Sequence, residues 1–189
     1  MKHSEIIERI EENPVIAAVR NEGDLDGAIA SQVTTIFLLH ADIFNLNQMV
    51  EKVKAAGKTV LIHIDFLEGL GRDNKAIDYI CEIVKPHGII STKSSNIKYA
   101  LEKGIFTIQR FFLIDSQSYD NSIKTIQSIK PDMIEIMPGV MPMVIKSILG
   151  RLSVPLIAGG LIETKEDILG ILNAGALGAS TGKKQLWSI

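Results

Sequence analysis

The stretch PLIAGGLIETKEDILGILNAGALGASTG, residues 155–182, contains a complete strand–helix–strand unit. The apolar runs Pro155–Ala158 and Ala176–Ser180 have the length of buried strands. Between them, Thr164–Ala174 begins with a Thr-x-x-Asp capping box and ends at Gly175, which is typical of a helix. Two strands joined by one helix run parallel with a right-handed crossover. We therefore expect this unit to belong to a parallel sheet covered by helices.

The same alternation extends towards the N-terminus. The eight expected strands are Val15–Val19, Thr35–Leu39, Thr59–Ile64, Gly88–Ser91, Phe106–Gln109, Met133–Met137, Pro155–Ala158 and Ala176–Ser180. The amphipathic segments between them are Asp24–Ser31, Asn45–Ala56, Asn74–Val84, Ser94–Lys103, Asp120–Ile129, Val140–Leu149 and Thr164–Ala174. Eight repeats of this kind predict a small α/β protein, a (β/α)8 TIM-like barrel. The alternative is an open doubly wound sheet, because GKKQLWSI after the last strand leaves only a reduced last helix.

A leading helix is expected before the first strand. Ile6, Ile7 and Ile10 lie on one face of the segment Ser4–Glu12, which ends before Asn13-Pro14. This helix is placed to cover the bottom of the barrel. The length of 189 residues fits one domain, residues 1–189, with short loops.

The composition narrows the range of functions. A formal net charge of -2 gives no overall attraction to nucleic acid, so an RNA contact would need a local basic patch. Cys81 is the only cysteine, which excludes an internal disulfide and indicates a reducing compartment. No apolar run approaches the length of a membrane helix, so we expect a cytoplasmic protein without membrane contact. Neither a GxxxxGK[ST] nor a first-strand GxGxxG motif is present, and no dense His/Asp/Glu cluster suggests a metal, so no cofactor or metal is expected.

The last two expected strands end in residues suited to an anion. Gly159 and Gly160 let the backbone approach a ligand closely, and Ser180, Thr181 and Gly182 offer two hydroxyls and a glycine. In β/α barrels the loops after strands seven and eight frequently bind phosphate. The sequence therefore predicts a phosphate site at these five residues, although both loops could also be ordinary tight turns.

Charged residues recur at the other strand ends. Arg20, Asp65, Lys93 and Arg110 each follow or end an expected strand, which places them at the mouth of the barrel. Glu135 lies within the run MIEIM, and strand alternation places it on the interior face with the two methionines. A buried carboxylate needs a partner, so Glu135 either forms a salt bridge, for example with Lys93 or Arg110, or recognises a ligand.

His63 and Asp65 form a second polar pair. Alternation places both on the face opposite Ile62 and Ile64. They could be a catalytic pair, a metal pair or a hydrogen-bonded layer that holds the barrel mouth.

Aligned in this way, the sequence resembles the glycerol uptake operon antiterminator regulatory family. The matching segments are VIAAVR (15–20), VLIHIDFLEGLGRD (60–73), ICEIVKPHGIISTKSS (80–95), TIQRFFLIDS (107–116), KPDMIEIMPGVMP (130–142), PLIAGGLIET (155–164) and ALGASTGKKQLW (176–187). The resemblance implies a non-enzymatic regulator that senses glycerol 3-phosphate, binds an mRNA leader and promotes transcription antitermination of glycerol-uptake genes. It also implies an anion at the five loop residues named above, with Lys93, Arg110 and Glu135 near the glycerol end or the mouth.

Two other functions remain open at this stage. A phosphate-binding barrel of the aldolase, isomerase or epimerase type could use Glu135, Asp65, His63 or Lys93 in acid–base or Schiff-base chemistry. A ligand sensor could instead act through a protein partner. A homodimer is compatible with a regulator, although no segment of the sequence is diagnostic of one.

Overall fold

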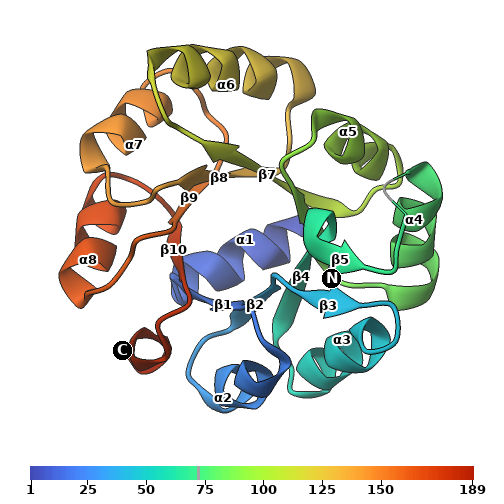
Figure 1. Cartoon of the computed structure of the whole chain (residues 1–189). Coiled ribbons are helices and arrows are strands. Elements are labelled where there is room, and N and C mark those ends of the chain that lie inside the picture. Colours follow the sequence, from blue (N-terminus) through green and yellow to red (C-terminus); the bar gives the residue numbers. More distant parts are fainter. Residues whose placement is uncertain (72) are drawn as a thin grey trace.

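Eight parallel strands close into a barrel in the computed structural model, which describes residues 1–71 and 73–189 (Figure 1). These strands are β1 (Val15–Val19), β2 (Thr35–Leu38), β4 (Thr59–His63), β6 (Gly88–Ser91), β7 (Phe106–Phe112), β8 (Met133–Met137), β9 (Leu156–Gly159) and β10 (Gly178–Thr181). Strand β1 pairs with both β2 and β10, so the sheet closes without a free edge. The expected (β/α)8 barrel is confirmed, and the open sheet is excluded.

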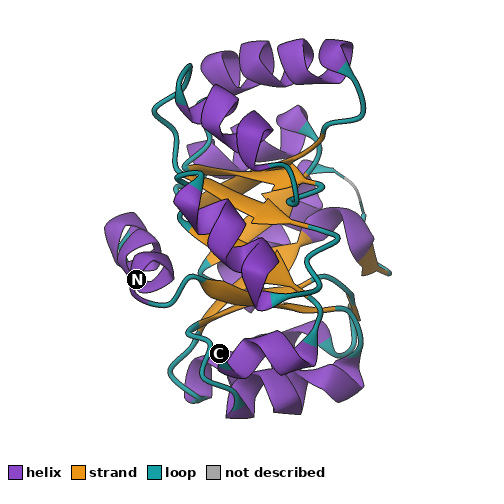
Figure 2. Cartoon of the chain, turned by 90° about the vertical axis from the view of Figure 1, so that its left-hand side faces the viewer, coloured by secondary structure: helices purple, strands orange, loops and turns teal. Residues whose placement is uncertain are grey.

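Helices surround the strands (Figures 1 and 2). They are α2 (Leu25–Ala30), α3 (Leu46–Ala55), α4 (Asn74–Tyr79), α5 (Ser94–Glu102), α6 (Ser116–Ile129), α7 (Pro142–Leu149) and α8 (Lys165–Asn173). A π-helical turn, Ile80–Val84, continues α4, and short 3-10 turns cover Glu22–Asp24 and Ile64–Phe66. After β10 only the 3-10 turn Lys184–Ser188 remains, which confirms the reduced last helix.

The barrel has two hydrophobic layers. Inside it lie large side chains from alternate strand positions, among them Phe37, Leu61 and Ile108. Helix α1 (His3–Glu12) adds Ile6 and Ile10 to this interior cluster, so it closes the N-terminal end of the barrel as expected. Figure 2 shows this helix beyond one end of the strands. The second layer packs the outward strand residues against the helices.

Several boundaries differ from the sequence expectation, and two of them differ by three or four residues. Helix α6 begins at Ser116 instead of Asp120, because Asp115 accepts a hydrogen bond from Ser118 N at 2.7 Å and caps the helix. Strand β7 continues to Phe112 because its pairing with β8 extends to Met137. Both differences depend on hydrogen bonds that hydrophobic periodicity does not encode.

A second, two-stranded sheet lies outside the barrel wall. It pairs β3 (Ala41–Asp42) with β5 (Leu67–Glu68), and Ile43 N donates to Glu68 O at 3.0 Å. This sheet ties together the loops that follow β2 and β4. It therefore stabilises one side of the barrel mouth.

Candidate functional site

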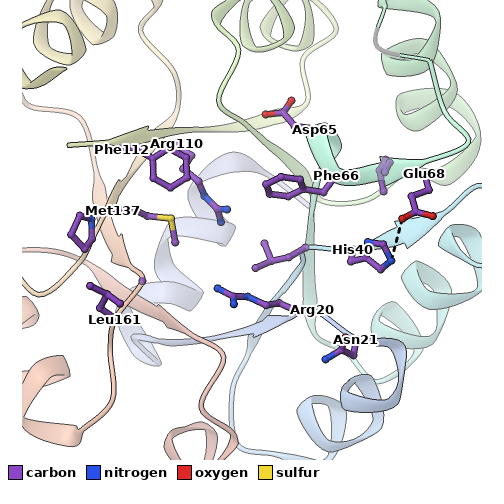
Figure 3. Close-up of a pocket in the computed structure, with 14 residues that line it drawn as sticks. Arg20, Asn21, His40, Asp65, Phe66, Glu68, Arg110, Phe112, Met137 and Leu161 are labelled. Carbon is purple, nitrogen blue, oxygen red and sulfur yellow. Dashed lines mark ion pairs between the residues drawn. The ribbon is translucent and has the colours of Figure 1, made fainter. Parts of the chain in front are cut away.

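A pocket of about 970 Å³ opens at the C-terminal ends of the strands (Figure 3). Its lining residues come from the ends of six strands and the loops after them: Arg20, Asn21, Leu39, His40, Asp65, Phe66, Leu67, Glu68, Arg110, Phe112, Met137, Pro138, Gly160 and Leu161. This is the face on which β/α barrels carry their sites, and the volume suits a small ligand. Four of the predicted residues line the pocket, namely Arg20, Asp65, Arg110 and Gly160.

Two guanidinium groups converge on the pocket. Figure 3 shows the side chains of Arg20 and Arg110 both reaching towards its centre. Arg20 is exposed and forms no hydrogen bond or ion pair with any described residue. Arg110 is only 4 % exposed, and its Nη2 has no hydrogen-bond partner among the described residues. A guanidinium with free N–H groups is suited to bind an anion such as a phosphate.

Glu135 anchors Arg110 from within the barrel. Its carboxylate is fully buried, and Oε2 accepts from Arg110 Nε at 2.6 Å. The other oxygen, Oε1, accepts from Ser180 Oγ at 2.5 Å. Arg110, rather than Lys93, is therefore the salt-bridge partner of Glu135. The pair fixes the direction in which the guanidinium faces the pocket.

The glycine loop and the end of β10 lie beside this buried pair. Gly160 has a φ of +78°, which a residue with a side chain rarely adopts. The hydroxyls of Ser180 and Thr181 are already used, because Ser180 donates to Glu135 and Thr181 donates to Ile162 O at 3.2 Å. The backbone N–H groups of Gly160 and Gly182 donate to no backbone acceptor among the described residues. The two predicted hydroxyls therefore already have partners within the protein, and Gly160 is the one of the five predicted loop residues that lines the pocket.

The structure does not bring Lys93 to the pocket. Strand β6 ends at Ser91, and Lys93 is the exposed residue that precedes helix α5. It is absent from the pocket lining, so the expectation that it faces the ligand is not supported. The reason is the tight turn into α5, where Lys93 N donates to Ser91 Oγ at 3.1 Å.

Asp65 holds this turn in place. Its carboxylate accepts hydrogen bonds from Ser91 Oγ at 2.7 Å, Thr92 N at 2.7 Å, Thr92 Oγ1 at 2.8 Å and Asn96 Nδ2 at 3.3 Å. Burial raises the pKa of Asp65, but the hydrogen bonds from Thr92 and Ser91 outweigh it, so the pKa lies below its usual value. Of the three interpretations of His63 and Asp65, the hydrogen-bonded layer describes Asp65.

This network predicts a pH-dependent contribution to stability. Asp65→Asn is expected to lower the free energy of unfolding by about 2 kcal/mol at pH 7, because the hydrogen bonds to a carboxylate are lost. The folded pKa lies below the unfolded value of 3.8, so the stabilisation is present above that pH and is lost as the pH falls through the folded pKa. Urea unfolding of both proteins at pH 7 and pH 3 measures the effect. A difference that is the same at both pH values would contradict it.

The pocket walls were not anticipated from the sequence. Phe66, Phe112 and Leu161 are 49 %, 50 % and 69 % exposed, and all three line the pocket. Figure 3 shows Phe66 and Phe112 on either side of the Arg110 guanidinium. The available signal was their position, one or two residues after Asp65, Arg110 and Gly160, where a loop residue faces the barrel mouth. His40 Nε2 lies 3.8 Å from Glu68 Oε1, and this pair forms the wall of the pocket on the side away from Met137 and Leu161 (Figure 3).

Residues 1–71 and 73–189 contain no group of three or more His, Cys, Asp or Glu side chains arranged to hold a metal ion. Among the same residues, no helix has the length and apolar character needed to cross a membrane.

The fold and the mouth define a β/α barrel with a partly apolar pocket, into which two guanidinium groups reach, at the C-terminal ends of its strands. Residues 15–187 match the family described as glycerol-3-phosphate responsive antiterminator, and the chain belongs to this regulatory family.

Individual relatives agree with this assignment. The chain is 39 % identical over 184 residues to the uncharacterized protein YgcP of Escherichia coli (strain K12), covering 97 % of this chain and 96 % of that protein. It is similar to the crystal structure of the glycerol uptake operon antiterminator regulatory protein from Listeria monocytogenes, with a TM-score of 0.89, 36 % identity and coverage of 93 % and 95 %. It is also similar to the crystal structure of a glycerol uptake operon antiterminator-related protein from Thermotoga maritima, with a TM-score of 0.82 and 33 % identity. That match covers 92 % of this chain and 96 % of the other. An N-acetylmannosamine-6-phosphate 2-epimerase from Clostridium perfringens, at 13 % identity and a TM-score of 0.69, shares only the fold.

Proposed function

We propose that this protein senses glycerol 3-phosphate, or a closely similar small phosphorylated molecule, at the barrel mouth. It binds an mRNA leader, with the ligand as the switch, and promotes transcription antitermination of glycerol-uptake genes. Membership of a family named for the response to glycerol 3-phosphate supports this regulatory role.

One observation carries the ligand assignment. Arg20 and the buried Arg110 both reach into the same pocket, which Gly160 also lines. Arginine N–H groups and glycine backbone N–H groups are the donors that proteins use for phosphate oxygens. The charge of Arg110 is offset by Glu135, so Arg20 is the guanidinium of the pocket that has no ion-pair partner among the described residues.

The first experiment is a thermal unfolding titration with glycerol 3-phosphate, inorganic phosphate and glycerol, each added separately. A ligand that binds only the folded protein stabilises it by about 2.7 kcal/mol at a hundredfold excess over its dissociation constant. We expect a large shift with glycerol 3-phosphate, a small shift with phosphate and none with glycerol. Equal shifts with phosphate and glycerol 3-phosphate would contradict recognition of the glycerol part.

Arg20→Ala is expected to weaken glycerol 3-phosphate binding at least about tenfold, because a charge-assisted contact contributes about 1.5–3 kcal/mol. The free energy of unfolding should stay within about 0.5 kcal/mol of wild type, because Arg20 is exposed and forms no hydrogen bond or ion pair with a described residue. Isothermal titration calorimetry and urea unfolding measure the two quantities.

Arg151→Ala is the matched control for this substitution. Arg151 is also an exposed arginine, but it precedes β9 and therefore lies at the opposite end of the barrel. Its removal should leave the affinity for glycerol 3-phosphate unchanged. Equal losses in both variants would indicate a general charge effect and count against a site at Arg20.

The RNA part of the proposal has its own test. Fluorescence anisotropy with a labelled leader RNA should show binding that weakens with added salt and changes when glycerol 3-phosphate is present. An RNA affinity that is indifferent to glycerol 3-phosphate would contradict the proposed switch.

The Schiff-base form of the enzymatic alternative gains no support from the pocket. A Schiff-base mechanism needs a lysine beside the ligand, and no lysine stands among the described residues that line the pocket.

A further inference from the structure

The imidazole of His63 is buried without a hydrogen-bond partner. His63 ends strand β4 and is fully buried, on the interior face of the strand with Leu61. Neither Nδ1 nor Nε2 has a hydrogen-bond partner among the described residues. A buried polar group without a partner costs free energy, and in native proteins such groups often mark a functional site.

His63 lies directly behind the pocket wall. Its ring stacks on the ring of Phe66, with centroids 4.3 Å apart and an interplanar angle of 27°. Phe66 lines the pocket and is 49 % exposed, so a ligand that displaces this ring would reach His63. Arg110, which also lines the pocket, is close enough to His63 to affect its charge.

The protonation state of His63 follows from these neighbours. Burial, and after it the positive charge of Arg110, lower the pKa of His63 to about 3. The ring is therefore neutral at physiological pH and offers one N–H donor and one nitrogen acceptor. Arg110 Nη2, which is buried and also without a partner, adds a further donor.

We propose that His63 and Arg110 Nη2 form a polar subsite that receives the hydroxyl-bearing end of the phosphorylated ligand. The subsite selects polyol phosphates against phosphates with a purely apolar chain. This inference rests on the proposed function, because it assigns the second end of the molecule whose phosphate binds at Arg20 and Gly160.

The chemistry of the subsite favours a hydroxyl over a second anion. A hydroxyl both donates and accepts, which matches a neutral imidazole beside a guanidinium N–H. Glu135 already offsets the charge of Arg110, so a second anionic group would find no excess positive charge at this depth. A site built to bond a hydroxyl rejects an analogue that lacks it, because its buried polar groups then stay unpaired.

The test compares two probes and one pair of matched variants. Glycerol 3-phosphate and n-propyl phosphate share the phosphate and the chain length but differ in the two hydroxyls. Their affinities for wild type, His63→Phe and His87→Phe are measured by isothermal titration calorimetry, and the thermal stability of each protein is measured without ligand. His87 is a suitable control because its Nδ1 accepts from Val60 N at 3.0 Å, at the N-terminal end of the barrel.

We expect His63→Phe to lower the affinity for glycerol 3-phosphate at least tenfold and the affinity for n-propyl phosphate less than twofold. Its stability without ligand should equal or exceed that of wild type, because two unpartnered polar atoms are removed. His87→Phe should be less stable than wild type, because it loses a hydrogen bond, and should bind both probes normally. His63→Leu repeats the test with a smaller side chain in case Phe does not fit, and His63→Gln should restore part of the selectivity.

Two results separate this inference from the function on which it rests. If wild type binds neither probe, the proposed function fails and the subsite fails with it. If wild type binds glycerol 3-phosphate but the His63 variants lose both affinities equally, or lose neither, only the subsite is overturned.

Discussion

Glu135→Ala is expected to lower the free energy of unfolding by about 3–5 kcal/mol, the largest effect of any single substitution proposed for this protein. The reason is the position of the pair, since Arg110 and Glu135 are 3 % and 0 % exposed in their side chains. Removal of the carboxylate leaves the guanidinium buried without its counter-charge and leaves Ser180 Oγ without its acceptor. Urea unfolding at pH 7 measures the change.

The matched control for this prediction is the double variant Arg110→Met/Glu135→Leu. Replacing both charges with apolar groups of similar size removes the desolvation cost together with the ion pair, so most of the stability should return. Binding of glycerol 3-phosphate should not return, because the guanidinium that faces the pocket is gone. Equal instability of the single and double variants would contradict the explanation by an unpaired buried charge.

Gly159→Ala is expected to lower the free energy of unfolding by about 2–3 kcal/mol, the upper part of the range for an overpacked core. A Cβ at this position would lie 2.6 Å from Glu135 Oε1 and nearer still to Ser180 Oγ. The collision falls on the hydrogen bond between these two side chains, so the alanine must displace part of the buried network. The same displacement should weaken binding of glycerol 3-phosphate, because it moves the partner of Arg110.

Gly27→Ala is the control for this second prediction. Gly27 lies in helix α2, and a Cβ there would meet no heavy atom within 4 Å. Alanine in a helix should be neutral or stabilising by up to about 1 kcal/mol. Thermal and urea unfolding compare the two variants. A Gly159→Ala protein as stable as Gly27→Ala would contradict the prediction, because the Ser180–Glu135 contact would then have shifted without loss of stability.

The barrel itself was predictable to a large extent. Buried parallel strands consist of short aliphatic runs, and helix ends carry local signals such as the Thr164–Asp167 capping box, whose Thr164 Oγ1 accepts from Asp167 N at 3.1 Å. The small sheet β3–β5 was not predictable. Two-residue strands have no periodicity, and they pair only because the barrel brings two loops together.

The candidate site was predictable only in part. Four of the predicted residues line the pocket, but Lys93 does not, and the apolar walls were not predicted. Strand alternation places Glu135 on the interior face and the strand ends place Arg110 and Ser180 at the mouth, and in the structure the three side chains meet. The sequence does not show that Ser180 donates to Glu135 instead of facing the pocket. Nor does it show that Lys93 lies outside the pocket. Those outcomes depend on the order of the strands in the barrel and on their register.

Sequence alone determined the order of strands and helices, the closing helix α1 and the set of polar residues at the strand ends, because each of these has a local signal in apolar periodicity, capping or chain position. The tertiary structure decided which of those polar residues meet. Closure of the barrel places Glu135 between Arg110 of β7 and Ser180 of β10, and it leaves His63 buried behind Phe66 without a partner. The physical reason is that hydrogen bonds and ion pairs between side chains depend on distances of a few ångströms across strands, and those distances exist only when the eight strands are joined in one register.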